Sequence, residues 1–313
     1  MIKPNLIATT PLSKVDVSRW RDGTLSNTKD SVAEEVPIAM IYNGISHAVM
    51  LATPQDLEDF ALGFSLSEGI LQNKHELYDI EIFAQKNGIE LKIEVASEAF
   101  ANLKQHRRNL TGRTGCGLCG AESLQDALRL DSLQHSYRQL THDSATEDIE
   151  STGLKYASSS FQATKHKSDS YAANKTSLQS KVNAASIQNA FRAMHNKQIL
   201  QQATGATHAC AWVNVDGDIQ LLREDVGRHN AMDKLIGALA KKPVKNNGFV
   251  LTSSRASVEM VQKVALAGLH ILAAISAPTG LAIRVAQQFD VTLVGFLRDN
   301  SFVIYCHPQR IIF

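Results

Sequence analysis

Apolar and polar residues alternate with a period of two along four short runs in the first third of the chain. Such alternation is typical of strands that bury one face. The predicted strands cover residues 36–42, 47–53, 78–84 and 89–95. The first two are joined through Asn43-Gly44, a dipeptide typical of hairpin turns. Residues 57–71 repeat apolar side chains at helical spacing, so this third is expected to form an α+β unit.

The last third of the chain alternates between the two periodicities. Strands are predicted at residues 209–215, 219–223, 249–252, 270–275, 291–297 and 302–306. Helices are predicted at residues 184–202, 229–239, 256–269 and 281–289. Regular alternation of strand and helix favours an α/β domain in which helices cover a mixed sheet.

The middle of the chain has two segments of unusual composition. Residues 111–120 read TGRTGCGLCG and precede a predicted helix at 121–133. The next 49 residues, 135–183, are rich in Ser, Thr, Lys and Ala, a composition that buries little apolar surface and is typical of a linker or insertion. We therefore expect three regions: an α+β part over 1–134, a polar insertion over 135–183, and an α/β domain over 184–313.

Composition excludes some classes of function. The chain has 32 Lys and Arg against 31 Asp and Glu, a net charge of +1, which predicts no nucleic-acid partner. Its longest apolar stretch, residues 264–277, is interrupted by Gly268 and His270 and is too short to cross a bilayer. The first residues carry no apolar signal segment. We expect a cytoplasmic protein without a membrane partner.

Cys116 and Cys119 form a Cys-x-x-Cys pair, which has three common interpretations. It can be half of a zinc site, completed by ligands such as His208 with Cys210, although no second clean ligand pair follows. It can be a redox dithiol, although flanking glycines disfavour the fixed geometry that such a pair needs. It can also hold a nucleophilic thiolate that carries sulfur. The spacing alone leaves these alternatives open.

Features around the pair agree with a reactive thiolate. A helix amino terminus near Ala121 and the cation of Arg113 would both lower the pKa of a thiol. The glycines on either side of Cys116 permit backbone angles that other residues avoid, so the loop can move between a sulfur donor and an acceptor.

The motif TGCGLCG, residues 114–120, resembles the loop of the FdhD/NarQ family of formate dehydrogenase accessory sulfurtransferases. Further stretches resemble the family in the same order along the chain. They are LEDFALGFSLSEGI (57–70), TGATHAC (204–210), EDVGRHNAMDKLIG (224–237), TSSRASVEMVQKVALAG (252–268), SAPTGLAI (276–283), TLVGFLR (292–298) and YCHPQRI (305–311).

The resemblance implies a sulfurtransferase that works through a persulfide. Cys116 would accept sulfur from a cysteine desulfurase, with Cys119 as its neighbour. The sulfur would pass to the molybdenum of a bis(molybdopterin guanine dinucleotide) cofactor before its insertion into formate dehydrogenase. The resemblance also implies a cytidine deaminase-like three-layer carboxy-terminal domain and a homodimer, and no resident metal.

Ten positions are candidates for site residues. Two are the cysteines above. The resemblance assigns cofactor binding to the turn made of Phe296, Leu297, Arg298, Asp299, Asn300 and Ser301, and a polar hairpin turn is the structural alternative. Arg228 and Arg255 each stand where a helix is predicted to begin, a place suited to phosphate. Ordinary helix caps, with Asp225 or Asn230 satisfying amides, are the alternative there. Cys210 is expected to be a buried core residue.

Two other functions compete with sulfur transfer. A zinc-bearing chaperone of the cofactor would use the same cysteines without transferring sulfur. A nucleoside deaminase would need a His-x-Glu or Cys-x-Glu motif followed by Pro-Cys-x-x-Cys. Gly115 precedes Cys116 and no glutamate follows His208 at that spacing, which disfavours a deaminase.

Overall fold

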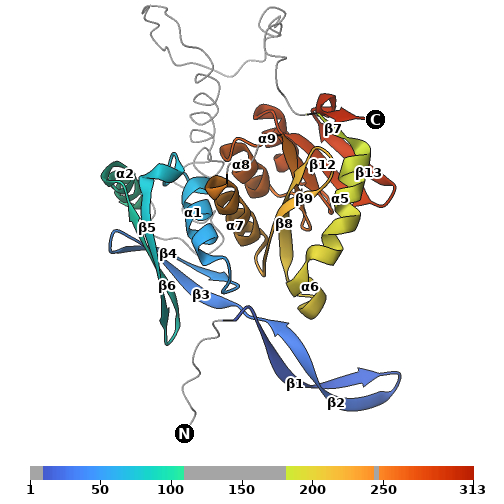
Figure 1. The fold of residues 1–313 in the computed structure, drawn as a ribbon, viewed down its shortest axis with the longest axis horizontal. Coiled ribbons are helices and arrows are strands. Elements are labelled where there is room, and N and C mark those ends of the chain that lie inside the picture. The colour runs from blue at the N-terminus through green and yellow to red at the C-terminus, as the bar shows by residue number, and fades with distance from the viewer. Residues whose placement is uncertain (1–9, 109–180, 243–246) are drawn as a thin grey trace, which may run out of the picture.

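The computed structural model describes residues 10–108, 181–242 and 247–313. They form a mixed α/β structure with a four-stranded sheet in the amino-terminal part and a six-stranded sheet in the carboxy-terminal part (Figure 1). Two two-stranded ribbons complete the strands in these ranges. The predicted helix at 121–133 and most of the predicted insertion lie outside the described residues, and the three-region division stays a prediction.

The four-stranded sheet has the order β4-β3-β6-β5. Its strands are β3 (Val36–Tyr42), β4 (Ile45–Ala52), β5 (Leu77–Gln85) and β6 (Gly88–Val95), and the helices that accompany it are α1 (Leu57–Ser67), η1 (Lys74–Glu76) and α2 (Ser97–Arg108). Asn43 and Gly44 both have positive φ, 43° and 80°, as the favoured hairpin turn requires. All four predicted strands are confirmed. The helix predicted over 57–71 ends earlier, and Gly69 follows it with φ 70°.

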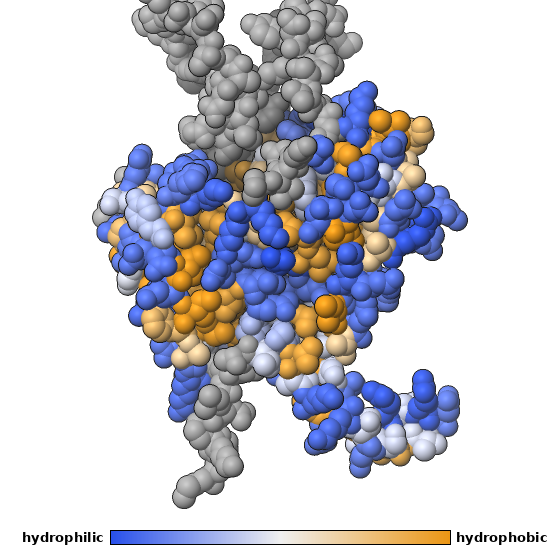
Figure 2. Space-filling model, in the orientation of Figure 1, coloured by the Kyte–Doolittle hydropathy of each residue, from blue (hydrophilic) through white to orange (hydrophobic). Residues whose placement is uncertain are grey.

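A hairpin of β1 (Leu12–Arg21) and β2 (Thr24–Ala33) extends away from the body of the molecule (Figure 1). This hairpin was not predicted from the sequence, because few of its residues are apolar and neither face is consistently apolar. Its surface is mostly polar in Figure 2, although Trp20 near the tip is 70% exposed. The turn Asp22-Gly23, with φ of 50° and 80°, was the available signal.

The six-stranded sheet has the order β13-β12-β11-β10-β8-β9. Its strands are β8 (His208–Asn214), β9 (Ile219–Asp225), β10 (Gly248–Thr252), β11 (Ile271–Ala274), β12 (Thr292–Arg298) and β13 (Ser301–Cys306). β10, β11 and β12 are parallel, and the outer pairings are antiparallel. A small parallel ribbon joins β7 (Val182–Asn183) to β14 (Ile311–Ile312), next to η2 (Pro308–Arg310).

Helices cover both faces of this sheet. One core packs the sheet against α7 (Arg228–Lys241), α8 (Val258–Leu266) and α9 (Gly280–Gln288). The other packs it against α5 (Ala184–Lys197). The long helix predicted over 184–202 is interrupted at Gln198, and α6 (Ile199–Thr204) follows. The arrangement is the expected layered α/β structure, and its cytidine deaminase-like character stays a prediction.

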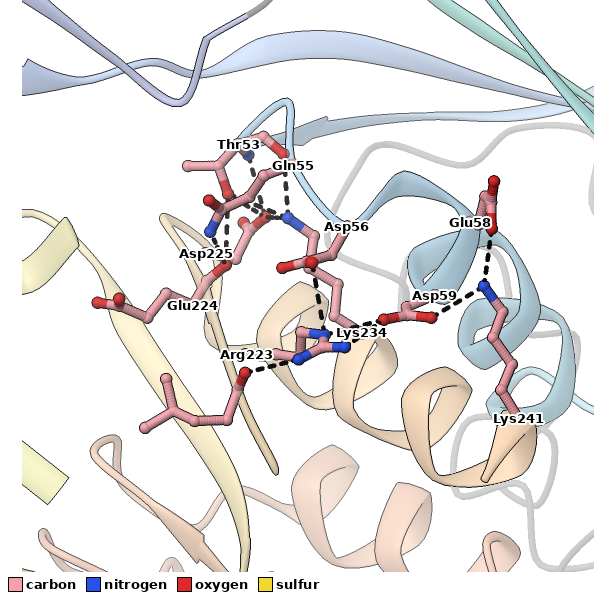
Figure 3. Close-up of polar contacts among 11 residues, drawn as sticks. Thr53, Gln55, Asp56, Glu58, Asp59, Arg223, Glu224, Asp225, Lys234 and Lys241 are labelled. Carbon is pink, nitrogen blue, oxygen red and sulfur yellow. Dashed lines mark hydrogen bonds and ion pairs between the residues drawn. The ribbon is translucent and has the colours of Figure 1, made fainter. Parts of the chain in front are cut away.

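The two sheet-containing parts meet where α1 packs against α7 (Figure 3). Glycines make the close approach of the two helices possible. A Cβ at Gly63 would overlap the carbonyl oxygen of Asp233, and a Cβ at Gly237 would overlap that of Asp59. The helix backbones therefore touch directly, and α1 of one part fixes the position of α7 in the other.

Candidate functional site

One edge of the six-stranded sheet collects the motifs that the sequence singled out. β9, β10, β11 and β12 all end at this edge, and the antiparallel β8 begins there with His208. α7, α8 and α9 begin in the loops that follow β9, β10 and β11. Ligands of open α/β sheets bind at this kind of edge, where loops and helix amino termini converge. The edge from β9 to β12 spans four strand spacings, roughly 19 Å at about 4.8 Å each.

Hydrogen bonds connect the neighbouring loops along this edge. The amide of Ser276 donates to the carbonyl of Ser254 at 3.5 Å, and the amide of Phe296 donates to the carbonyl of Ser276 at 3.3 Å. The guanidinium of Arg298 donates to the carbonyl of Ile275 at 2.9 Å. Segments distant in sequence are therefore held side by side at the carboxyl ends of β10, β11 and β12.

Glu224 and Asp225, which open the EDVGRHN motif, have structural roles (Figure 3). Glu224 accepts hydrogen bonds from the amides of Leu200 and Gln201, so it caps the start of α6. Asp225 accepts from the amides of Thr53 at 3.0 Å and of Gly227 at 2.8 Å. Asp225 therefore satisfies the amide of Gly227, the residue before α7, although no side chain caps that helix, and it ties the two parts of the molecule together.

The next two residues of the motif have side-chain atoms without such partners. Arg228 Nε and His229 Nε2 are buried and accept or donate no hydrogen bond. His229 Nε2 lies 3.8 Å from a carboxylate oxygen of Glu259, too far for a direct hydrogen bond. The side chain of His229 is 32% exposed and that of Arg228 is partly buried, so a ligand can reach them. These residues, rather than the two acids, are available for chemistry.

A cluster of ion pairs and hydrogen bonds around Lys263 lies next to these residues. Lys263 of α8 donates to Asp233 at 2.7 Å, to Ser67 at 2.8 Å and to Glu68 at 3.1 Å. Burial raises the pKa of Asp233, and Lys263 opposes that rise. The cluster joins α1, α7 and α8, so it fixes the helix ends on which the candidate groups sit.

The predicted binding turn, 296–301, forms the end of β12, a turn and the start of β13. Phe296 has φ 53° at an irregularity of the β12–β13 pairing and is 43% exposed. Arg192 of α5 donates to the carbonyl of Asp299 at 2.6 Å. The turn is thus a polar hairpin, as the structural alternative expected, and it also lies at the site edge with Arg255 and Arg228. Cys116 and Cys119 lie outside the described residues.

A comparison with known protein families shows which family the chain belongs to. The model described as the FdhD/NarQ family matches residues 33–165 and 134–312. The chain belongs to the FdhD/NarQ family. A protein of Cupriavidus necator named "Sulfur carrier protein FdhD" is 50% identical over 296 residues, 94% of this chain and 88% of that protein. One of the same name from Xanthomonas euvesicatoria is 44% identical over 313 residues, 99% and 96% of the two chains.

A solved structure shares the fold of this FdhD/NarQ chain. It is the crystal structure of a formate dehydrogenase accessory protein from Desulfotalea psychrophila, with a TM-score of 0.65 and 21% identity. The match covers 96% of this chain and 99% of that one. The α/β architecture is therefore that of the family.

Glu259 and Glu68 adjoin the site of this family member but were not predicted as site residues. Both lie in stretches that resemble the family, 252–268 and 57–70. A signal existed for Glu68, because a carboxylate at the carboxyl end of a helix opposes the helix dipole and needs a cation nearby. That cation is Lys263, which comes 195 residues later.

The other cysteines of the FdhD/NarQ chain that the structure describes are core residues. Cys210 is fully buried and burial raises its pKa to about 12, which confirms the expected core role. Cys306 is buried too, and its thiol donates to the carbonyl of Val291. Within the described ranges no group of three His, Cys, Asp or Glu side chains is arranged to hold a metal. No helix of those ranges is long and apolar enough to cross a membrane.

His229 is expected to stay neutral at pH 6. Burial lowers its pKa to about 4, helped by the cations of Arg228 and Lys263, while Glu259 and Glu68 oppose them. The unfolded chain binds this proton more tightly, so the contribution of His229 to stability is complete above pH 6.5 and declines as the pH falls toward 4. An NMR titration of the ring measures the pKa. Arg228→Met should raise it, and a wild-type value near 6.5 would contradict the expectation.

Proposed function

We propose that the chain is a sulfur carrier in the maturation of formate dehydrogenase, with Cys116 as the thiol that holds the sulfur. The observation that carries this proposal is the match to proteins named as sulfur carriers over 94–99% of the chain at 44–50% identity. The Cys-x-x-Cys loop supplies a thiol suited to the task. A cysteine desulfurase is the donor, and formate dehydrogenase is the enzyme served.

The acceptor is the molybdenum of bis(molybdopterin guanine dinucleotide), which the chain binds as a substrate. The roughly 19 Å edge from β9 to β12 supports an elongated ligand with phosphates, because helix amino termini and arginines lie along it. Arg228 and Arg255 are the candidates for phosphate contacts. The turn 296–301, with its exposed Phe296, is the candidate for contact with one of the ring systems. A homodimer in the cytoplasm is part of the same proposal.

The cysteine pair gives a balanced route for releasing the sulfur. The donor converts the thiol of Cys116 into the persulfide Cys116–S–SH. Attack of the Cys119 thiolate on the inner sulfur breaks the S–S bond and expels the outer sulfur as hydrosulfide. A disulfide between the two cysteines remains, so the two thiols provide the two electrons. Reduction of this disulfide by a cellular dithiol restores the carrier.

Intact mass spectrometry after incubation with a cysteine desulfurase and cysteine tests the sulfur carrier. We expect wild-type protein to gain about 32 Da, the mass of one sulfur atom bound as a persulfide. Cys116→Ala should abolish the gain. Cys210→Ala is the matched control, because that thiol is buried and should not contribute.

The zinc-bearing chaperone is the competing function. No gain of mass while the desulfurase turns over, together with stoichiometric zinc that is lost in Cys119→Ala, would refute sulfur transfer and favour that alternative.

A further inference from the structure

The hairpin of β1 and β2, here called the arm, carries an exposed apolar pair near its tip. Trp20 and Leu25 are partners across the two strands, so their side chains lie on the same face of the ribbon. Trp20 is 70% exposed and Leu25 is 66% exposed. A two-stranded hairpin alone buries too little apolar surface to be stable in water, and tryptophan is enriched among the anchors of protein interfaces. The arm therefore has the properties of a segment that packs against a partner.

The arm is held at its base and reaches far from it. The amide of Glu34 donates to the carbonyl of Pro11 at 2.9 Å, and β2 contacts α6. Each strand has 10 residues, which corresponds to a length of roughly 34 Å. The arm points away from the four-stranded sheet of its own chain (Figure 1). Its tip is thus placed to contact another molecule.

The four-stranded sheet offers a matching apolar face. Val49 and Leu51 of β4 are 61% and 55% exposed, and their partners on β3 are Ala39 and Pro37. Met50, which lies between them, points to the opposite face and packs in the core that contains α1. Val49 and Leu51 therefore lie on the face turned away from α1, and Figure 2 shows apolar residues gathered where this sheet lies.

The position of β4 strengthens the case for a partner. β4 is at the edge of the sheet, and it contains no Lys, Arg, Asp or Glu. Edge strands of soluble proteins normally carry charges or are covered, because an apolar edge invites pairing with another chain. The apolar face of this sheet and its uncharged edge are consistent with a surface that another molecule covers.

Charges around the two surfaces are complementary. Glu90 of β6 pairs with Ala39, so it lies on the same face as Val49. The exposed or half-buried charged residues of β5 and β6 on this face are three acids and one lysine: Glu81, Glu90, Glu94 and Lys92. The arm carries four basic and three acidic side chains over residues 12–33. A net positive arm and a net negative border favour docking of the one on the other.

We propose that a second copy of this chain covers the apolar face, by an exchange of arms in a two-fold dimer. Trp20 and Leu25 of each chain pack against Val49 and Leu51 of the partner subunit. Each chain supplies one tip and one face, so a two-fold axis forms the same contact twice and leaves neither surface uncovered. This inference rests on the homodimer of the proposed function and names the surfaces that form it.

The size of the contact fits a stable dimer. Such an interface buries about 1,200–2,000 Å² in total. An aromatic side chain buries about 150–250 Å², and the exchange buries two tryptophans, two leucines and a similar area of the faces that they cover. Together the two contacts are of the required order.

Sedimentation equilibrium of the full-length chain over a range of concentrations tests the proposal. We expect wild-type protein to dimerise. Trp20→Asp at the tip and Val49→Asp on the face should each raise the dimer dissociation constant by about 100-fold or more, because each change affects both contacts. Phe313→Asp is the matched control, since Phe313 is an aromatic residue with 89% exposure at the chain end, away from the arm (Figure 1). Circular dichroism verifies that the variants fold.

Mixing the two variants separates exchange of arms from general damage. In a mixed dimer the unaltered tip of the Val49→Asp chain packs on the unaltered face of the Trp20→Asp chain. One contact is then intact, whereas neither variant alone can form any. The mixture should associate at least about tenfold more tightly than either variant by itself, since one tryptophan anchor is restored.

Three outcomes would overturn the proposal, and they differ in what else they affect. A wild-type monomer at every concentration would exclude the homodimer too, and would indicate that a different protein covers the face. A dimer that Trp20→Asp and Val49→Asp leave unchanged, or a mixture without gain, would exclude the exchange of arms alone. The sulfur carrier is tested independently, by the gain of about 32 Da on Cys116.

Discussion

Gly63→Ala is expected to lower the free energy of unfolding by about 3 kcal/mol or more, beyond the usual range for overpacked sites. A methyl group at this position overlaps the backbone carbonyl of Asp233 and would lie 2.7 Å from the amide nitrogen of Gly237. Backbone atoms cannot turn away as a flexible side chain can. The two helices would have to separate, and with them the buried contacts between the parts would loosen.

Helix propensity would change stability in the opposite direction, so the sign of the measured change distinguishes the two effects. Alanine normally stabilises a helix interior by about 0.5–1 kcal/mol relative to glycine, so a loss of stability must come from the helix contact. Urea titration followed by circular dichroism measures the change. Glu58→Ala is the control: its carboxylate is exposed and only its surface ion pair with Lys241 of α7 is lost, so stability should change by less than about 1 kcal/mol. Unchanged or increased stability in Gly63→Ala would show that the helices are not in backbone contact.

The periodicity of the sequence predicted most of the two large sheets, because their strands bury one face or both. Val36–Tyr42 alternates buried and partly buried residues along its whole length. The hairpin β1–β2 could not be found this way, since its strands have no core face and Val17 and Thr28 pair in a mostly exposed ribbon. Helix α2 was also missed. Most residues of α2 are polar, and only one side of the helix, with Ala99 and Leu103, is buried.

The site was predictable in its parts but not in its assembly. The sequence placed Arg228 and Arg255 at helix starts, and both stand at the same sheet edge because β9 and β10 point the same way. Nothing local indicated that Glu259 faces His229, because that contact depends on the packing of α7 against α8. The structural role of Asp225 was equally hidden, since its partner Thr53 comes 172 residues earlier.

Lys234→Met is expected to destabilise the protein by about 3–5 kcal/mol, the usual cost of removing one partner of a buried ion pair. Lys234 and Asp225 are both fully buried, with Nζ and Oδ2 at 2.7 Å. Nζ also donates to the carbonyl of Thr53 at 3.0 Å. Removing the ammonium leaves the carboxylate of Asp225 without a counter-charge. The segment before α1 also loses the hydrogen bond from Lys234 to Thr53, while the bond from Asn230 of α7 to the carbonyl of Leu51 remains.

A double-mutant cycle separates this pair from general disturbance of the core. Asp225→Asn alone should also destabilise, because burial already lowers the pKa of Lys234 and the loss of Asp225 removes the charge that raises it. Lys234→Met combined with Asp225→Asn should be less destabilised than the sum of the single changes, by about 1–3 kcal/mol of coupling. Additive losses in urea titrations would contradict a direct ion pair. Asp225 also accepts a hydrogen bond from the amide of Gly227, the residue before α7. Asp225→Asn should therefore also weaken ligand binding at the sheet edge, because the start of α7 sets the position of Arg228.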